Sequence, residues 1–155
     1  MIKILASTVA VLLASTTVAS AESFTFTSTA TIANQVGGPV AGGKPVGASS
    51  SNGESDTTFA SGKKAKSKLQ CANWSAQPGQ LFTSIGFCTA DDGTSKYTVA
   101  FSCQATDEKN TASDCWGRLT GVSGAYQGKV GTASWHGAQN ADGKSGTATG
   151  QGAWN

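Results

Sequence analysis

Three side chains in the second half of the chain are suited to binding a ligand. Trp116 and Arg118 lie two positions apart, so in a strand both would point to the same face. An aromatic ring beside a guanidinium can receive an anionic or aromatic ligand. The favoured alternative is that Trp116 packs against the region of Cys103 and Cys115 while Arg118 reaches solvent. Tyr126 is the third candidate ligand-binding residue.

His136 is the only histidine and therefore the natural candidate for a general base. It is expected at a strand end beside Trp135, where a surface or turn position is the favoured interpretation. Tyr126 precedes it by ten residues, about 33 Å along a strand, so the two cannot share a site. The sequence contains no nucleophile-elbow motif, no His-x-x-x-His pair and no phosphate-binding glycine loop. We therefore assign no catalytic residue, no metal and no cofactor.

Four cysteines are expected to form two disulfides: Cys71, Cys88, Cys103 and Cys115. Zinc binding is the alternative. No two cysteines have the short spacing of zinc ligands, and His136 lies well beyond the last of them. Bridged Cα atoms must lie within about 7 Å, which favours neighbouring strands. The preferred pairs are Cys71 with Cys88 and Cys103 with Cys115.

The disulfides require an oxidising compartment, and residues 1–21 have the form of a signal peptide. Lys3 precedes a mostly apolar run, and Ala19-Ser20-Ala21 supplies small residues for cleavage before Glu22. A retained membrane anchor is the alternative, but an apolar run of about 15 residues is short for a span of about 20. The sequence predicts a periplasmic or secreted protein.

Removal of 21 residues from the 155 would leave residues 22–155, expected to form a single domain. Lys3 is the one charge lost, so the formal net charge falls from +2 to +1. This near-neutrality argues against nucleic-acid binding, which usually requires a basic excess. Large aliphatic residues and phenylalanine are scarce, so disulfides are expected to supplement a thin core.

The pattern along the chain predicts an all-β protein. Strands are expected over residues 24–32, 57–61, 64–71, 81–89, 96–103, 115–119, 126–136 and 144–154. Glycines inside strands mark the bends that curl a sheet into a barrel. About eight strands therefore predict a small antiparallel up-and-down barrel, with an open β-sandwich as the alternative.

Residues 34–56 are rich in glycine, proline and serine, and they include Pro39 and Pro45. Prolines interrupt a sheet because they lack the backbone N–H. We expect a long exposed loop over this segment.

A hairpin is expected where residues 81–89 and 96–103 flank the turn sequence 91–94. In the second strand, one face carries Tyr97, Val99, Phe101 and Cys103. In the first, the apolar face is expected to carry Leu81, Ile85 and Phe87. This arrangement places Cys88 on the wrong side unless Gly86 marks a bulge.

A short basic cluster precedes the first cysteine: Lys63, Lys64, Lys66 and Lys68. Its favoured interpretation is a solvated strand face that discourages edge-to-edge association. The alternative is a patch for anionic lipid headgroups or polysaccharide.

Residues 121–131, Gly-Val-Ser-Gly-Ala-Tyr-Gln-Gly-Lys-Val-Gly, resemble the glycine-and-aromatic stretch of small barrels of the allene oxide cyclase and dirigent type. The resemblance covers residues 117–135. The wider pattern, with Cys115-Trp116-Gly117 and Gly152-Ala153-Trp154, is similar to uncharacterised exported bacterial small β-barrel proteins. The resemblance implies a barrel whose interior binds a small hydrophobic molecule, and some family members are cyclases. No catalytic residue of those families matches here.

The tryptophans are Trp74, Trp116, Trp135 and Trp154. Sugars stack on exposed aromatic faces, but with few large apolar residues these rings are expected in the core or a cavity wall.

The leading function hypothesis is an exported barrel that holds a small apolar ligand. The alternative is a structural or surface-interaction protein without a pocket, and a cyclase- or isomerase-like enzyme is a third hypothesis. Stable membrane insertion is not expected, because the Gly/Ser/Thr-rich C-terminal strands supply no continuous apolar band. The sequence contains no signal for an oligomeric state.

Overall fold

The computed structural model describes residues 21–38, 46–76 and 80–155. Antiparallel strands and one 3₁₀ turn make up the fold: β1 Glu22–Gly38, β2 Val46–Phe59, β3 Lys64–Ser75, β4 Ser84–Asp91, β5 Lys96–Ala105, β6 Ala112–Ser123, η1 Gly124–Tyr126, β7 Val130–Gln139 and β8 Ser145–Trp154. The predicted leader covers residues 1–21, and all of it except Ala21 lies outside the described residues.

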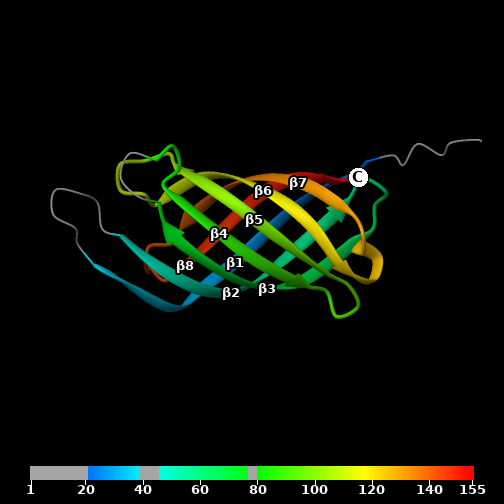
Figure 1. Ribbon diagram of the computed structural model, residues 1–155, viewed down its shortest axis with the longest axis horizontal. Coiled ribbons are helices and arrows are strands. Elements are labelled where there is room, and N and C mark those ends of the chain that lie inside the picture. Colours follow the sequence, from blue (N-terminus) through cyan, green and yellow to red (C-terminus); the bar gives the residue numbers. More distant parts are fainter. Residues whose placement is uncertain (1–20, 39–45, 77–79) are drawn as a thin grey trace, which may run out of the picture.

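The eight strands close into one barrel in sequence order (Figure 1). Each strand pairs with its sequence neighbour, and β8 returns to pair with β1 from Glu22↔Trp154 to Thr31↔Ser145. Closure satisfies the backbone groups that an open edge would leave unpaired. The predicted up-and-down barrel is therefore confirmed, and the open sandwich is excluded.

The predicted loop over residues 34–56 is wrong for its described part. Strand β1 continues to Gly38 and β2 begins at Val46, with pairing maintained from Asn34↔Ser50 to Gly38↔Val46. A register shift between Ile32 and Asn34 accommodates the extension. The hydrogen bonds between paired strands join backbone groups and do not depend on large side chains. The hairpin therefore continues through residues of low strand propensity. Pro39 and Pro45 lie outside the described residues.

The hairpin between β4 and β5 is confirmed, together with its turn. The Asp92 carboxylate accepts hydrogen bonds from the backbone N–H of Thr94 at 2.9 Å and of Ser95 at 2.7 Å. Partial burial opposes ionisation of Asp92, but hydrogen bonds from Thr94 and Ser95 outweigh it, so its pKa lies below the usual value. The paired aspartates therefore serve the turn, as aspartate commonly does.

The predicted face of β4 is inverted, and Gly86 marks no bulge. Pairing of β4 with both neighbours runs without a register shift, and Cys88 faces inward while Phe87 is 42% exposed. A β-carbon at Gly86 would lie 2.3 Å from Cζ of Phe101. The ring of Phe101 thus occupies the interior beside β4, so inward positions of that strand must be small.

Both preferred disulfides are present. Cys71 bonds to Cys88 across β3 and β4, and Cys103 bonds to Cys115 across β5 and β6. Each joins residues directly opposite in the register. On the inner side of the wall, one bridge therefore links β3 to β4 and the other links β5 to β6.

Aromatic rings fill the interior near one end of the barrel. The buried cluster comprises Phe24, Phe59, Leu119, Tyr126, Ala133 and Trp154. Trp154 stacks on Tyr126 with ring centroids 4.9 Å apart, and Tyr97 meets it edge-on at 5.4 Å. A β-carbon at Gly152 would lie 2.4 Å from Cζ of Phe24. Inward glycines thus make room for rings from other strands, as in designed barrels.

The lysine-rich strand β3 is not an edge strand, because it pairs with β2 on one side and β4 on the other. Lys66 on β3 forms ion pairs with Glu54 at 3.1 Å and Asp56 at 3.6 Å, both on β2. The prediction that the lysines of β3 face solvent is confirmed. The prediction that they protect a sheet edge is wrong, because β3 is paired on both sides.

Candidate functional site

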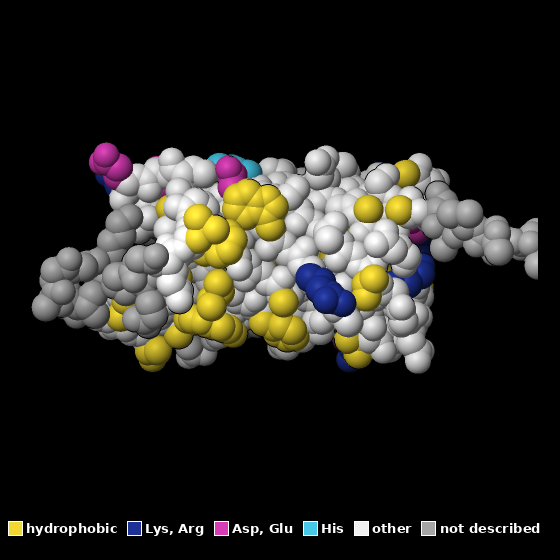
Figure 2. All heavy atoms as spheres, turned by 45° about the horizontal axis from the view of Figure 1, so that its top comes forward, with side chains coloured by type: hydrophobic (Ala, Val, Ile, Leu, Met, Phe, Trp, Pro, Cys, Tyr) yellow, Lys and Arg dark blue, Asp and Glu magenta, His cyan; other side chains and the backbone are white. Residues whose placement is uncertain are grey.

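The outer wall carries large aromatic side chains that were expected inside from the sequence. Trp116 is 51% exposed and Trp74 is 46% exposed. Cross-strand pairing places both in one row, Trp74↔Ile85↔Ser102↔Trp116. Figure 2 shows apolar side chains gathered on this face of the barrel. We call Trp74, Ile85, Phe87 and Trp116 the aromatic patch; they line a surface depression of about 410 Å³.

Strand alternation explains why these rings are outside. Cys115 faces inward to reach Cys103, so Trp116 must face outward. The sequence favours packing of Trp116 against the Cys103–Cys115 region. That prediction is wrong, because the ring and the disulfide lie on opposite faces of the wall. Its aromatic neighbour is Phe82, with ring centroids 6.4 Å apart. The other two tryptophans, Trp135 and Trp154, lie inward, as expected of core residues.

A second and larger depression, of about 1020 Å³, borders the patch on the outer face of β1, β2, β6, β7 and β8. We call it the polar groove, after the hydroxyl and amide groups that stand along it. Trp116 and Arg118 stand on one side, Phe24 and Phe59 also belong to the lining, and most of the exposed lining is apolar. Its outward-facing residues are Ser23, Thr25, Thr58, Ala60, Trp116, Arg118, Thr132, Ser134, Gln151 and Ala153.

The sheet register explains the order of side chains in the polar groove. One row runs Trp116↔Ser134↔Gln151↔Thr25↔Thr58 across the strands. Neighbouring strands lie about 4.8 Å apart, so polar groups follow Trp116 at that interval. Trp116 is thus the boundary between the aromatic patch and a row of hydroxyl and amide groups.

Arg118 lies on the same outer face, two residues after Trp116, as the sequence predicted. In the register it is flanked by Ala100 and Thr132. Among the described residues no ion pair involves Arg118, and no aspartate or glutamate lines the groove. Its guanidinium is therefore available to an anionic group on a ligand.

Tyr126 is not part of this surface. It closes the one-turn helix η1, not a strand, and its ring is 7% exposed against Trp154. Burial raises the pKa of its phenol. The predicted strand over residues 126–136 therefore begins later, at Val130. The chain turns before it, and the Gly121 N–H donates a hydrogen bond to Lys129 O at 2.9 Å across that turn. Tyr126 is thus a core residue that fills one end of the barrel.

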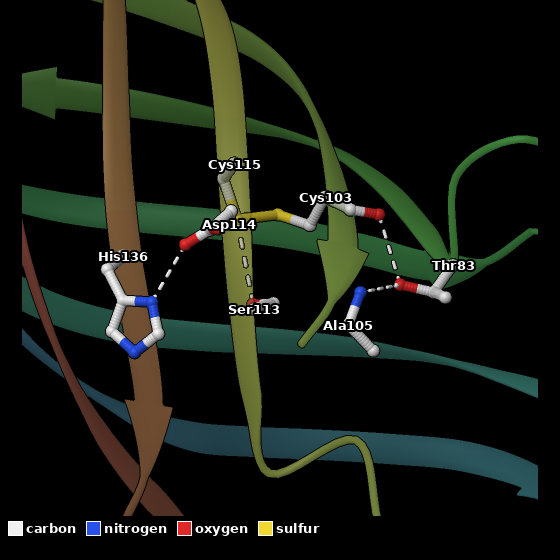
Figure 3. Close-up of a disulfide and its surroundings, with 7 residues drawn as sticks. All are labelled: Thr83, Cys103, Ala105, Ser113, Asp114, Cys115 and His136. Carbon is white, nitrogen blue, oxygen red and sulfur yellow. Dashed lines mark hydrogen bonds and ion pairs between the residues drawn. A yellow bond between two sulfur atoms is a disulfide. The ribbon is translucent and has the colours of Figure 1, made fainter. Parts of the chain in front are cut away.

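His136 and Asp114 form a pair on the outside of β7 and β6 (Figure 3). Nδ1 of His136 lies 2.8 Å from Oδ1 of Asp114, and both side chains are half-exposed. Ser134, Trp116 and the pair line a depression of about 460 Å³. No hydrogen bond joins Ser134 to His136 in the described structure, and alternate residues of a strand lie about 7 Å apart. A serine nucleophile with a histidine base is therefore not assembled here.

Consecutive residues place the Asp114–His136 pair and the Cys103–Cys115 disulfide on opposite faces of the wall (Figure 3). Thr83 fixes the adjoining end of β5: its Oγ1 donates to Cys103 O at 3.0 Å and accepts from Ala105 N–H at 2.9 Å. These bonds hold the end of β5, which pairs with β6, the strand that carries Asp114.

The end of the barrel opposite the aromatic cluster has a polar mouth. A depression of about 710 Å³ there is lined by inward positions that include Gln35, Ser49, Asn73 and Ser84. Ser49 donates a hydrogen bond to the Asn73 side chain. The chemistry of this mouth is hydrophilic, in contrast to the apolar cavity that the leading hypothesis requires.

No three His, Cys, Asp or Glu side chains within the described ranges are grouped to hold a metal ion. In the same ranges, no helix is long and apolar enough to cross a membrane. Comparison with protein-family models and with curated proteins found no match to the chain.

Proposed function

We propose that this protein is an exported binding module that engages its partner on the outer wall of the barrel, at the aromatic patch and the polar groove. The observation that carries the proposal is Trp116, a half-exposed indole at the boundary of both surfaces. Contiguous exposed apolar side chains on a soluble domain mark interaction sites. This is the surface-interaction alternative raised by the sequence, with a specific location.

The interior offers less support for an apolar ligand. Rings already occupy the space beside inward glycines, with Phe26 Cε1 2.8 Å from a β-carbon at Gly150. A ligand would have to displace such rings from a closely packed core. Interior binding, and the enzyme hypothesis suggested by the cyclase barrels, remain predictions from the sequence and its resemblance.

Export is part of the proposal. Two disulfides are compatible with an oxidising compartment. A secreted or periplasmic location further requires cleavage of the leader, which mass spectrometry of the N-terminus of the natural protein would test.

The four indole N–H groups provide a test of the binding surface. Two tryptophans, Trp74 and Trp116, face outward, whereas Trp135 and Trp154 face inward. In an NMR screen of ¹⁵N-labelled protein against a fragment library, we expect bound fragments to shift the Trp116 signal. The variant Trp116→Ala should lose those hits, and Val122→Ala, an exposed site outside the groove, should keep them. Hits that shift only Trp135 and Trp154 would contradict the proposal and favour interior binding.

A further inference from the structure

Polar side chains of the groove near Trp116 are free to bond to a ligand. Among the described residues, Thr25, Thr132, Ser134 and Gln151 make no side-chain hydrogen bond to another residue, although all four line one groove. Hydroxyl and amide groups both donate and accept. A ligand with many hydroxyl groups would pair with them at successive strands.

Trp116 adds an aromatic platform to this polar row. The face of an indole carries negative charge density, and it attracts the weakly positive C–H groups on one face of a sugar ring. A sugar therefore presents an apolar face to the ring and hydroxyl groups to the groove. The row from Trp116 to Thr58 crosses four strand spacings, or about 19 Å, which suits a chain of several sugar units.

Arg118 adds a positive charge to the groove. It lies beside Trp116 on the groove wall, with no acidic side chain in the lining. A guanidinium binds a carboxylate through two parallel hydrogen bonds. We infer that Trp116, Arg118 and the polar row of the groove bind a glycan chain that carries carboxylate groups, as uronic acids do. This inference rests on the proposed outer-wall function.

A protein partner fits the groove less well. An apolar protein surface would cover the aromatic patch but leave the hydroxyl groups of Thr25 and Ser134 without partners, which costs free energy. A glycan satisfies the aromatic ring, the polar row and the cation together.

Isothermal titration with defined oligosaccharides tests the inference. The probes are oligogalacturonate, oligomannuronate and hyaluronan fragments, with cellohexaose as a neutral control. We expect at least one acidic probe to bind more tightly than cellohexaose. Trp116→Ala should weaken that binding about tenfold. Arg118→Gln should weaken it by a similar factor and remove the preference over cellohexaose.

Matched variants separate the glycan from other ligands. Gln151→Ala should weaken acidic-probe binding severalfold, because it removes one partner of the row, whereas Val122→Ala should leave it unchanged. All these sites are on the outer surface, and melting temperatures check that each variant folds. Should Trp116→Ala fail to fold, Arg118→Gln gives an independent result.

Failure of every acidic probe, or equal binding by Arg118→Gln, would overturn the glycan inference. If the fragment screen still shifts Trp116 in that case, the outer-wall function stands and a protein partner becomes the better choice. If fragments shift only the inward indoles, the proposed function itself fails.

Discussion

Tyr97 shows how a single side chain couples the packed interior to pH. Its ring meets Tyr126 and Trp154 edge-on, and burial, with Tyr126 nearby, raises the pKa of its phenol to about 12. The folded state therefore keeps the phenol proton to higher pH than the unfolded state, whose pKa is about 10. The neutral phenol is the form that the barrel can hold.

Alkaline pH should consequently destabilise the protein. Below pH about 10 the phenol is neutral in both states and stability is at its full value. Between about 10 and 12 only the unfolded state ionises, so the free energy of unfolding should fall by about 2–3 kcal/mol. Urea unfolding at a series of pH values measures this. Tyr97→Phe should have a shallower decline, and an identical decline would contradict the role of Tyr97.

The aromatic residues on the outer wall show which side-chain directions the sequence predicts and which it does not. The shared face of Trp116 and Arg118 followed from their spacing and is confirmed. Apolar residues usually face inward, so the sequence predicts an inward Phe87, whereas the structure turns this ring outward. The conflict with Cys88 was visible in the sequence, and without a bulge at Gly86 an inward Cys88 requires an outward Phe87.

The disulfides are the first test at the scale of elements. Their sequence separations are 17 and 12 residues. Loops of this length predict that each bridge stabilises the fold by about 3 kcal/mol, mainly by constraining the unfolded chain. Replacing Cys71 and Cys88 together by alanine should lower the free energy of unfolding by about that amount, measured by urea titration. Unchanged stability would show that the bridge is dispensable.

The connection from β6 to β7 is a second test, because Gly121 leaves no room for a side chain. A β-carbon there would lie 1.6 Å from the carbonyl oxygen of Tyr126. Gly121→Ala should displace the turn that buries Tyr126 and cost about 2 kcal/mol or more. Gly137→Ala is the matched control, since its β-carbon would come no closer than 3.8 Å to the nearest neighbour. Equal melting temperatures for the two variants would contradict this account of Gly121.

Strand identity was predicted better than strand length. Alternation and turn residues located the β4–β5 hairpin, including the Asp92 turn. The glycines and serines of the β1–β2 hairpin have low strand propensity and predict a loop, but the structure has a paired hairpin there. Whether such a segment forms a strand depends on pairing with a neighbouring strand, and the strand propensity of its residues does not predict that pairing.

At the scale of the whole molecule, closure could be predicted because many short strands with inward glycines form a barrel that a few rings can fill. The location of the proposed binding surface could not be predicted, because it combines residues from β1, β2, β6, β7 and β8 that only the register brings together. The central proposal is that this barrel binds its partner on the outer wall and holds no apolar ligand inside.

Native mass spectrometry of the protein purified from its own host tests that claim most directly. Under non-denaturing conditions, we predict the mass of the bare chain with both disulfides intact, without a retained apolar molecule. A stoichiometric small apolar ligand, released only when the barrel unfolds, would contradict the claim and place the binding site inside.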